Sequence, residues 1–294
     1  MLSEVLTALQ CPVCQVSFAV DMRTDEDLAP HTSLTCTNGH SFDRARQGYV
    51  NMLVGRDPGT GDDADMVARR AAFLGAGHYA PIAEVLPSFP GRTSEDASDI
   101  SGLVVEVGAG TGYYLSHVLD RSPGTYGLAL DVSKFAARRA ARAHRRAEAI
   151  VADCWGRLPL ADSSVDVLLD VFAPRNAAEF ARVVNPGGVL AVVTPLPEHL
   201  AEIRQPLGML AMEDNKTDRV RESLASEFVE HSEIHVRRTM SLTRREVVDL
   251  VGMGPSARHT NPAERIAGLP ERIEVSLAVR LGLYAPRPRA RAPR

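Results

Sequence analysis

Three cysteines and one histidine near the start of the sequence have the types and spacing of a metal site. Cys11 and Cys14 form a CPVC pair, and Cys36 and His40 form a CTNGH pair further along the chain. Thiolates and imidazoles are the ligands that Zn²⁺ prefers, and four protein ligands leave no position open for a substrate. The sequence therefore predicts one structural Zn²⁺ per chain. Two coincidental cysteine pairs or a redox CxxC are the alternatives, although neither explains Cys36 and His40.

A glycine-rich loop, EVGAGTG, runs from Glu106 to Gly112 between a strand-like run and a helical pattern. At such a junction, backbone amides can approach a ligand closely. A dinucleotide fingerprint would need its third glycine where Tyr113 stands, and the Glu106 carboxylate would repel a pyrophosphate. S-adenosylmethionine carries a sulfonium and an amino group but no phosphate. Glu106 with Gly108, Gly110 and Gly112 therefore predicts this cofactor, whereas a strand-end turn of any α/β protein is the plainer alternative.

Two carboxylates at the ends of the next strands complete the predicted cofactor site. Asp131 follows the glycine loop by about 20 residues, the separation at which a carboxylate accepts hydrogen bonds from both ribose hydroxyls. Asp153 ends the following strand and is expected to accept from the adenine amino group, with Cys154 or Trp155 beside the ring. An exposed helix cap explains Asp153 equally well.

Basic and aromatic residues are concentrated between the cysteine-rich segment and the glycine loop. Arg69, Arg70, Phe73 and His78 recur at helical intervals, and such side chains bind unstacked RNA bases and phosphates. We predict an RNA-binding surface there, with a solvated helix face as the equal alternative. A second basic cluster lies on one predicted helix, and for it we favour an exposed structural face; it comprises Arg138, Arg139, Arg142, Arg145 and Arg146.

The elements that must position these residues alternate between strand and helix, which predicts a mostly parallel, doubly wound α/β sheet. Ser133 is expected to cap the predicted helix over 133–147. Residues 196–226 show no clear pattern, and the order then changes to strand, helix and strand over 228–239, 244–251 and 272–281. The predicted parallel strands are 103–107, 126–131, 149–152, 165–171 and 189–194, and the helices between them are 112–120, 133–147 and 177–184.

Composition limits the classes of protein that the chain can represent. Its 294 residues carry a net charge of −4, so nucleic-acid binding must depend on local basic patches. Four cysteines are too few for a disulfide-stapled secreted protein, and neither a signal peptide nor a membrane-length apolar run is found, so we expect a cytoplasmic protein without membrane contact. The expected domains are a zinc-binding domain (1–50), a helical link to an RNA cleft (51–100), a catalytic domain (101–284) and a basic disordered tail (285–294).

The motifs together resemble those of the bacterial 23S ribosomal RNA guanine-N1 methyltransferases, some of which confer resistance to macrolides such as tylosin. The shared segments are CPVC with CTNGH, SFDRARQGYVNML, RDPGTGDDADMVARRAAFLGAGHY, VVEVGAGTGYY, LALDVSK, FAPRNAAEFARVVNPGG and TPLPEHL. The resemblance implies a class I S-adenosylmethionine-dependent methyltransferase fold with a zinc domain, methylation of one hairpin-loop guanine of 23S ribosomal RNA, and a homodimer. It also implies that the zinc ligands are Cys11, Cys14, Cys36 and His40 and that the cofactor is lined by Glu106, Gly108, Gly110, Asp131 and Asp153.

Methylation of guanine N1 requires loss of a proton from that nitrogen, and two residues after the fourth strand are candidates for the reaction. Asp170, at the strand end, is geometrically eligible as the general base, but a cap or an ion-pair role fits it as well. Phe172 is expected to stack on the extruded base. Two other functions stay open, namely a small-molecule methyltransferase, which the zinc ligands argue against, and a non-catalytic zinc-containing RNA-binding protein.

Overall fold

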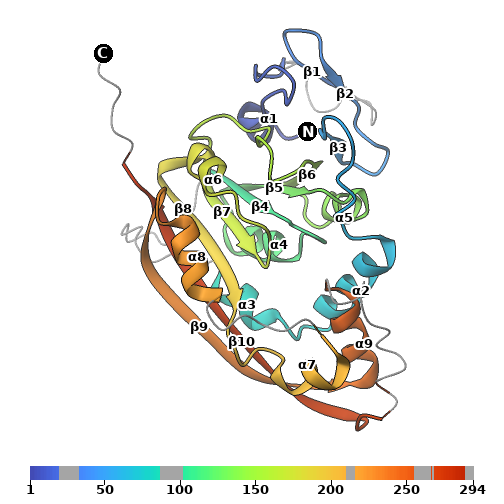
Figure 1. Cartoon of the computed structure of the whole chain (residues 1–294). Coiled ribbons are helices and arrows are strands. Elements are labelled where there is room, and N and C mark those ends of the chain that lie inside the picture. The colour runs from blue at the N-terminus through green and yellow to red at the C-terminus, as the bar shows by residue number, and fades with distance from the viewer. Residues whose placement is uncertain (20–32, 87–101, 210–215, 255–265, 267, 289–294) are drawn as a thin grey trace.

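An eight-stranded sheet forms the centre of the molecule, in the order β3-β6-β5-β4-β7-β8-β10-β9 (Figure 1). The computed structural model describes residues 1–19, 33–86, 102–209, 216–254, 266 and 268–288. The strands of the sheet are β3 (Val50–Asn51), β4 (Gly102–Val107), β5 (Thr125–Asp131), β6 (Ala147–Val151), β7 (Val165–Val171), β8 (Val184–Pro195), β9 (Phe228–Thr243) and β10 (Arg272–Pro286).

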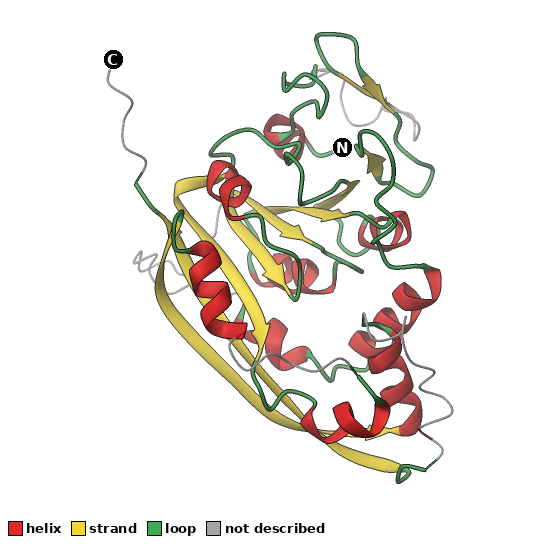
Figure 2. Ribbon diagram, viewed as in Figure 1, coloured by secondary structure: helices red, strands yellow, loops and turns green. Residues whose placement is uncertain are grey.

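The strands from β3 to β8 pair in parallel, with β4 between β5 and β7. Their apolar side chains are buried along nearly the whole length of each central strand. Such burial is expected when helices cover both faces of a parallel sheet, and helices do lie on both sides here (Figure 2). The predicted doubly wound architecture is therefore confirmed.

The helices between the parallel strands are short. Ser133 caps α5 as predicted, since its hydroxyl accepts hydrogen bonds from the amides of Phe135 and Ala136. The helices are α1 (Ser3–Ala8), α2 (Ala64–Gly75), α3 (Ala80–Val85), α4 (Tyr113–Arg121), α5 (Lys134–Ala140), α6 (Ala177–Val183), α7 (Ala201–Leu207), α8 (Lys216–Leu224) and α9 (Arg244–Gly252).

Helix α5 differs from the sequence-based prediction. The predicted helix over 133–147 ends at Ala140, and turns then lead to β6, which begins at Ala147. Parallel pairing of β6 with β5 outweighs the helical propensity of this Ala- and Arg-rich segment. As a result, Arg138 and Arg139 lie on the helix, whereas Arg142 lies in the turn after it.

The segment predicted to be patternless contains α7 and α8. Pro206 inside α7 obscures the helical pattern, but Ile203 and Leu207 are fully buried and hold the helix against the core. The last strands are also longer than predicted because β10 pairs antiparallel with β9 over its whole length and with β8 on its other side. They form the long curved edge of the sheet (Figure 1).

The N-terminal segment is attached to the sheet and not separate from it. β1 (Leu34–Thr35) and β2 (Ser41–Phe42) form a small sheet, but β3 pairs with β6, so the predicted boundary at residue 50 falls inside a strand. β10 likewise runs past the predicted start of the tail, to Pro286. Residues 87–101 of the predicted link and 289–294 of the predicted tail lie outside the described residues.

The helices that the structure describes are too short or too polar to cross a bilayer.

Candidate metal centre and cofactor cavity

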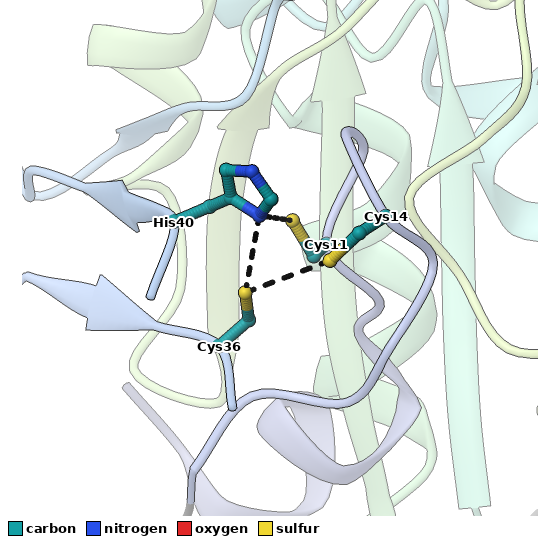
Figure 3. A group of neighbouring side chains, drawn as sticks. All are labelled: Cys11, Cys14, Cys36 and His40. Atoms are coloured by element: carbon teal, nitrogen blue, oxygen red, sulfur yellow. Dashed lines mark hydrogen bonds between the residues drawn. The ribbon is translucent and has the colours of Figure 1, made fainter. Parts of the chain in front are cut away.

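The four predicted zinc ligands converge on one point (Figure 3). Their ligand atoms all lie within 4.8 Å of one another. The Sγ atoms of Cys14 and Cys36 are 3.7 Å apart, and the His40 Nδ1 atom lies 3.5 Å from Cys36 Sγ and 3.7 Å from Cys11 Sγ. Zinc–sulfur and zinc–nitrogen bonds of normal length in a tetrahedron require edges of about 3.6 to 3.8 Å. The residues therefore fit a closed Cys₃His zinc site.

Tight turns present these ligands. The Gly39 amide donates to the Cys36 carbonyl at 2.8 Å, and a φ of +85° at Gly39 lets the turn return to His40. Beside the site, the rings of Phe18 and Phe42 pack edge to face at 5.9 Å. Phe18 also belongs to one buried cluster with residues of the sheet, so packing against the sheet supports the segment together with the metal.

A cavity of about 510 Å³ opens at the carboxyl ends of the central parallel strands. Glu106 and Asp131 line one part of it, at the ends of β4 and β5, and Phe172 lines another part after β7. Residues of α2 and α9 close the opposite side, among them Arg70 and Val251. In an open α/β sheet this edge is where ligands bind, and it brings together residues that are widely separated in the sequence.

The glycine loop lies against the cavity and is held by Asp131. One carboxylate oxygen of Asp131 accepts from the Gly110 amide and the other from the Ser133 amide, both at 2.8 Å. Each oxygen keeps a further lone pair that can accept a ribose hydroxyl. Gly108 has a φ of +61°, and a Cβ atom there would lie 2.7 Å from the Cβ of Ala173, so this position needs glycine.

Glu106 is buried at the base of the loop, with 1% of its surface exposed. One of its carboxylate oxygens accepts from the Leu115 amide at 3.1 Å, in the first turn of α4. Burial raises the pKa of this carboxyl to about 8. A cationic ligand group in the cavity would favour its ionised form.

Asp153 also lines the cavity, where its carboxylate accepts from the Trp155 amide at 2.9 Å. This is a local turn that stabilises the loop after β6. The Trp155 ring is 65% exposed. The adenine contact expected of Asp153 stays a prediction.

The predicted RNA-binding residues of α2 fall into different environments. Phe73 is fully buried in the core, so the prediction that it stacks on RNA is wrong: its helical spacing reflects packing. The guanidinium group of Arg69 pairs with Asp65 at 2.7 Å and lies 3.6 Å from Asp249, on α9.

Arg70 and His78 also form local contacts. Arg70 pairs with Asp62 at 2.6 Å and donates to the Met253 carbonyl at 2.6 Å. His78 Nε2 lies 2.8 Å from Glu246, so it joins the chain after α2 to α9. Arg70 lines the cavity, and both side chains hold this part of the chain against α9 or the residue that follows it.

Asp170 does not reach the cavity. It has no exposed surface, its Oδ1 accepts from the Ala173 amide at 3.2 Å, and it lies 3.6 Å from the guanidinium group of Arg175. Burial raises its pKa to about 7. Asp170 is not part of the cavity wall, so its contacts fit the cap and ion-pair roles, and the general base stays a prediction.

Phe172, in contrast, is 42% exposed and lines the cavity. Its φ of +57° is strained for an aromatic residue, and such strain is concentrated at functional sites. The neighbouring wall contains Tyr79 and His199, which the site prediction missed. The two are 120 residues apart in the sequence, and no local spacing connects them.

Part of the second basic cluster borders a different hollow, of about 640 Å³, between α2, α4 and α5. Arg138, Arg139 and Arg142 are exposed there, and none of them forms an ion pair with another described residue. Asp120, an acidic residue in the wall, lies 3.3 Å from His144. Uncompensated guanidinium charge is therefore greater on α5 than on α2.

Comparisons with known proteins match both parts of the chain. The family described as RlmA, N-terminal, a zinc ribbon, matches residues 9–54, and the family described as methyltransferase domain matches residues 104–188. A Micromonospora griseorubida protein, provisionally named 23S rRNA (guanine-N(1)-)-methyltransferase, is 50% identical over 296 residues, which cover 96% of this chain and 99% of that protein.

The 23S rRNA (guanine(748)-N(1))-methyltransferase of Streptomyces fradiae is 43% identical over 291 residues, which cover 98% of this chain and 100% of that protein. Among solved structures, an S-adenosylmethionine-dependent methyltransferase from Aquifex aeolicus has 15% identity and a TM-score of 0.49, and the match covers 76% of this chain and 98% of that one.

Proposed function

The chain belongs to the 23S rRNA (guanine-N1)-methyltransferase family, and from this premise we propose that it transfers a methyl group from S-adenosylmethionine to N1 of one hairpin-loop guanine in 23S ribosomal RNA. The observation that supports this most is the pairing of a closed Cys₃His cluster with an acidic, glycine-lined cavity in one chain. A methyltransferase for small metabolites has no need of the cluster.

Different residues of the cavity bind different parts of the cofactor in this proposal. Asp131 is placed to accept the ribose hydroxyls, Asp153 lies where the adenine is expected, and Glu106 supplies the acidic group for the cationic end. The glycines let the backbone approach the bound molecule. S-adenosylmethionine, when bound, supplies a methyl group on a sulfonium centre that is activated for in-line displacement.

The RNA approaches the cavity across α5 in this proposal. Arg138, Arg139 and Arg142 offer charge that no described carboxylate neutralises, and Tyr113 and Leu74 belong to the walls of both the hollow and the cofactor cavity. A phosphate backbone held in the hollow would therefore lie beside the cavity entrance. The target base leaves its stack to enter, and Phe172 offers it an exposed ring.

The test is incubation with isotopically labelled S-adenosylmethionine and, in separate reactions, 23S ribosomal RNA, its hairpin fragments or a metabolite extract. Nucleoside analysis of the product should give N1-methylguanosine from the RNA alone. Label in a small metabolite would support the second enzymatic function instead. Absence of label from every pool, with cofactor bound and zinc present, would support a non-catalytic RNA-binding protein.

The cellular setting belongs to the same proposal. We expect the protein to act in the cytoplasm on ribosomal RNA, as a homodimer, and to reduce sensitivity to macrolides such as tylosin. Sedimentation of the purified protein measures its oligomeric state. Inhibitory tylosin concentrations, compared between strains that carry and lack the protein, measure resistance.

A further inference from the structure

We propose that the hydroxyl group of Tyr79, oriented by His199, donates a hydrogen bond to O6 of the target guanine and stabilises the base after N1 has lost its proton. This inference rests on the proposed function and names the groups that select the base and assist its ionisation. It requires no general base at Asp170, which is fully buried and is not part of the cavity wall.

The pair lies in the part of the cavity wall that contains Phe172. Tyr79 precedes α3, Phe172 follows β7 and His199 follows β8. The ring centroids of Phe172 and His199 are 6.1 Å apart with nearly parallel planes, and the ring of Tyr79 is 6.2 Å from that of Phe172. The three rings form a compact aromatic recess, whereas Glu106 and Asp131 belong to the glycine-loop wall.

Backbone contacts fix the state of His199. Its Nδ1 atom lies 3.2 Å from the amide of Ala278, in a buried contact, and can only accept that proton. A neutral imidazole that accepts at Nδ1 carries its own proton on Nε2. The same segment is pinned to β10 by the Leu200 amide, which donates to the Ser276 carbonyl at 2.8 Å. His199 therefore presents an N–H group, not a base.

The Nε2 atom of His199 lies 3.3 Å from the hydroxyl oxygen of Tyr79. Because Nε2–H donates, the Tyr79 oxygen accepts, and the Tyr79 O–H is left to donate into the cavity. Burial raises the pKa of Tyr79 well above its ordinary value of 10, so this hydroxyl keeps its proton. The result is a preoriented donor of the kind that stabilises an oxyanion.

A donor at this position would both assist the reaction of guanine and distinguish guanine from adenine. Loss of the N1 proton to solvent water spreads negative charge over N1 and O6, and a donor at O6 stabilises that anion. The N1 lone pair then forms the new bond to the methyl carbon while the carbon–sulfur bond breaks, with its electron pair remaining on sulfur. Adenine carries an amino donor in place of O6, so the Tyr79 donor rejects it.

The primary test is Tyr79→Phe, which keeps the ring and removes the donor. We expect kcat for hairpin RNA to fall about 100-fold, as for loss of one oxyanion donor, with cofactor affinity unchanged. The pH at which kcat levels off should rise, because the variant no longer favours the ionised base. Tyr126→Phe, which removes a hydroxyl on the distant start of β5, is the matched control and should behave as the wild type.

A substrate change separates donation to O6 from a structural role. In a hairpin carrying 6-thioguanine at the target, sulfur is a poor acceptor, so the ratio of wild-type to Tyr79→Phe rates should shrink towards unity. An unchanged ratio, or an unaltered pH profile for Tyr79→Phe, would overturn the inference. If the wild type forms no N1-methylguanosine, the proposed function itself fails; if it does and Tyr79→Phe matches it, only this inference fails.

Discussion

Two carboxylates of the cofactor cavity, Asp131 and Glu106, perform different tasks because their surroundings differ. Asp131 accepts two backbone amides at 2.8 Å, whereas Glu106 accepts one at 3.1 Å and is more costly to ionise. The first carboxylate shapes the glycine loop, and the second responds to the charge of the ligand. Each role leads to a measurable expectation.

Asp131→Asn should weaken S-adenosylmethionine binding about 10- to 100-fold. The amide keeps one oxygen for the loop but loses a charged acceptor for the ribose, and a hydrogen bond to a charged group contributes about 1.5 to 3 kcal/mol. Titration calorimetry measures the affinity, with Asp218→Asn on the surface of α8 as the control. Unchanged affinity in a folded Asp131→Asn protein would remove this residue from the cofactor site.

Glu106 should make the ligand-free protein less stable as the pH rises. Its pKa is about 8 when folded and 4.5 when unfolded, so the folded state binds more protons between these values. The free energy of unfolding therefore falls from about pH 4.5 to about pH 8 and then levels off, by at most about 1.4 kcal/mol per pH unit.

Urea denaturation between about pH 6 and 9 compares the wild type with Glu106→Gln. The free energy of unfolding of Glu106→Gln should decline less steeply with pH. The part of the decline that is due to Asp170, whose pKa is about 7, should remain. If the free energies of unfolding of the two proteins change with pH in parallel, Glu106 is already ionised in the folded state.

The segment that contains the four zinc ligands, residues 11–40 (the zinc segment), and the sheet are expected to support different steps, namely RNA methylation and cofactor binding. No described residue of the zinc segment lines the cofactor cavity, although β3 extends the sheet at β6. Metal loss should therefore affect RNA methylation before it affects cofactor binding.

Cys14→Ser should reduce the zinc content from one ion per chain towards none, lower the melting temperature and abolish RNA methylation, while cofactor affinity is largely kept. The reason is that metal binding supplies folding free energy to a segment whose strands are only two residues long. Elemental analysis, calorimetry and the methylation assay measure the three effects. Cys154→Ser should keep a full zinc content, since Cys154 is remote from the cluster. Wild-type protein free of zinc after purification would contradict the assignment.

For the whole molecule, the distribution of charge matters more than its sum. The net charge is −4, yet Arg138, Arg139 and Arg142, on α5 and in the turn after it, are exposed without ion-pair partners among the described residues. Arg69 and Arg70, in contrast, are paired with carboxylates. An RNA that binds through phosphates should therefore depend on α5 more than on α2.

Replacing both Arg138 and Arg142 with alanine should flatten the salt dependence of RNA binding. Each lost phosphate contact on single-stranded RNA lowers the slope of log affinity against log salt by roughly 0.7. The double variant of Arg69 and Arg70 is the comparison, and we expect it to keep a slope close to that of the wild type. The opposite result would restore the α2 surface predicted from the sequence. Filter binding over a salt series measures both slopes.

The sequence by itself determined the features whose chemistry depends on short spacing. Cys11, Cys14, Cys36 and His40 were identified as a zinc set because paired knuckles bring ligands together locally, and the cluster confirms it. The glycine loop and the alternation of parallel strands and helices along the chain were predictable for the same reason, since strand, turn and helix are adjacent in the chain.

Only the tertiary structure decided which side chains face a ligand and which face the core. Phe73 and Asp170 have suitable residue types at suitable positions, but packing buries both completely. Tyr79 and His199 meet only because α3 and the segment after β8 close over the same end of the sheet. Contacts between segments so far apart depend on sheet register and packing, which residue spacing along the chain does not specify.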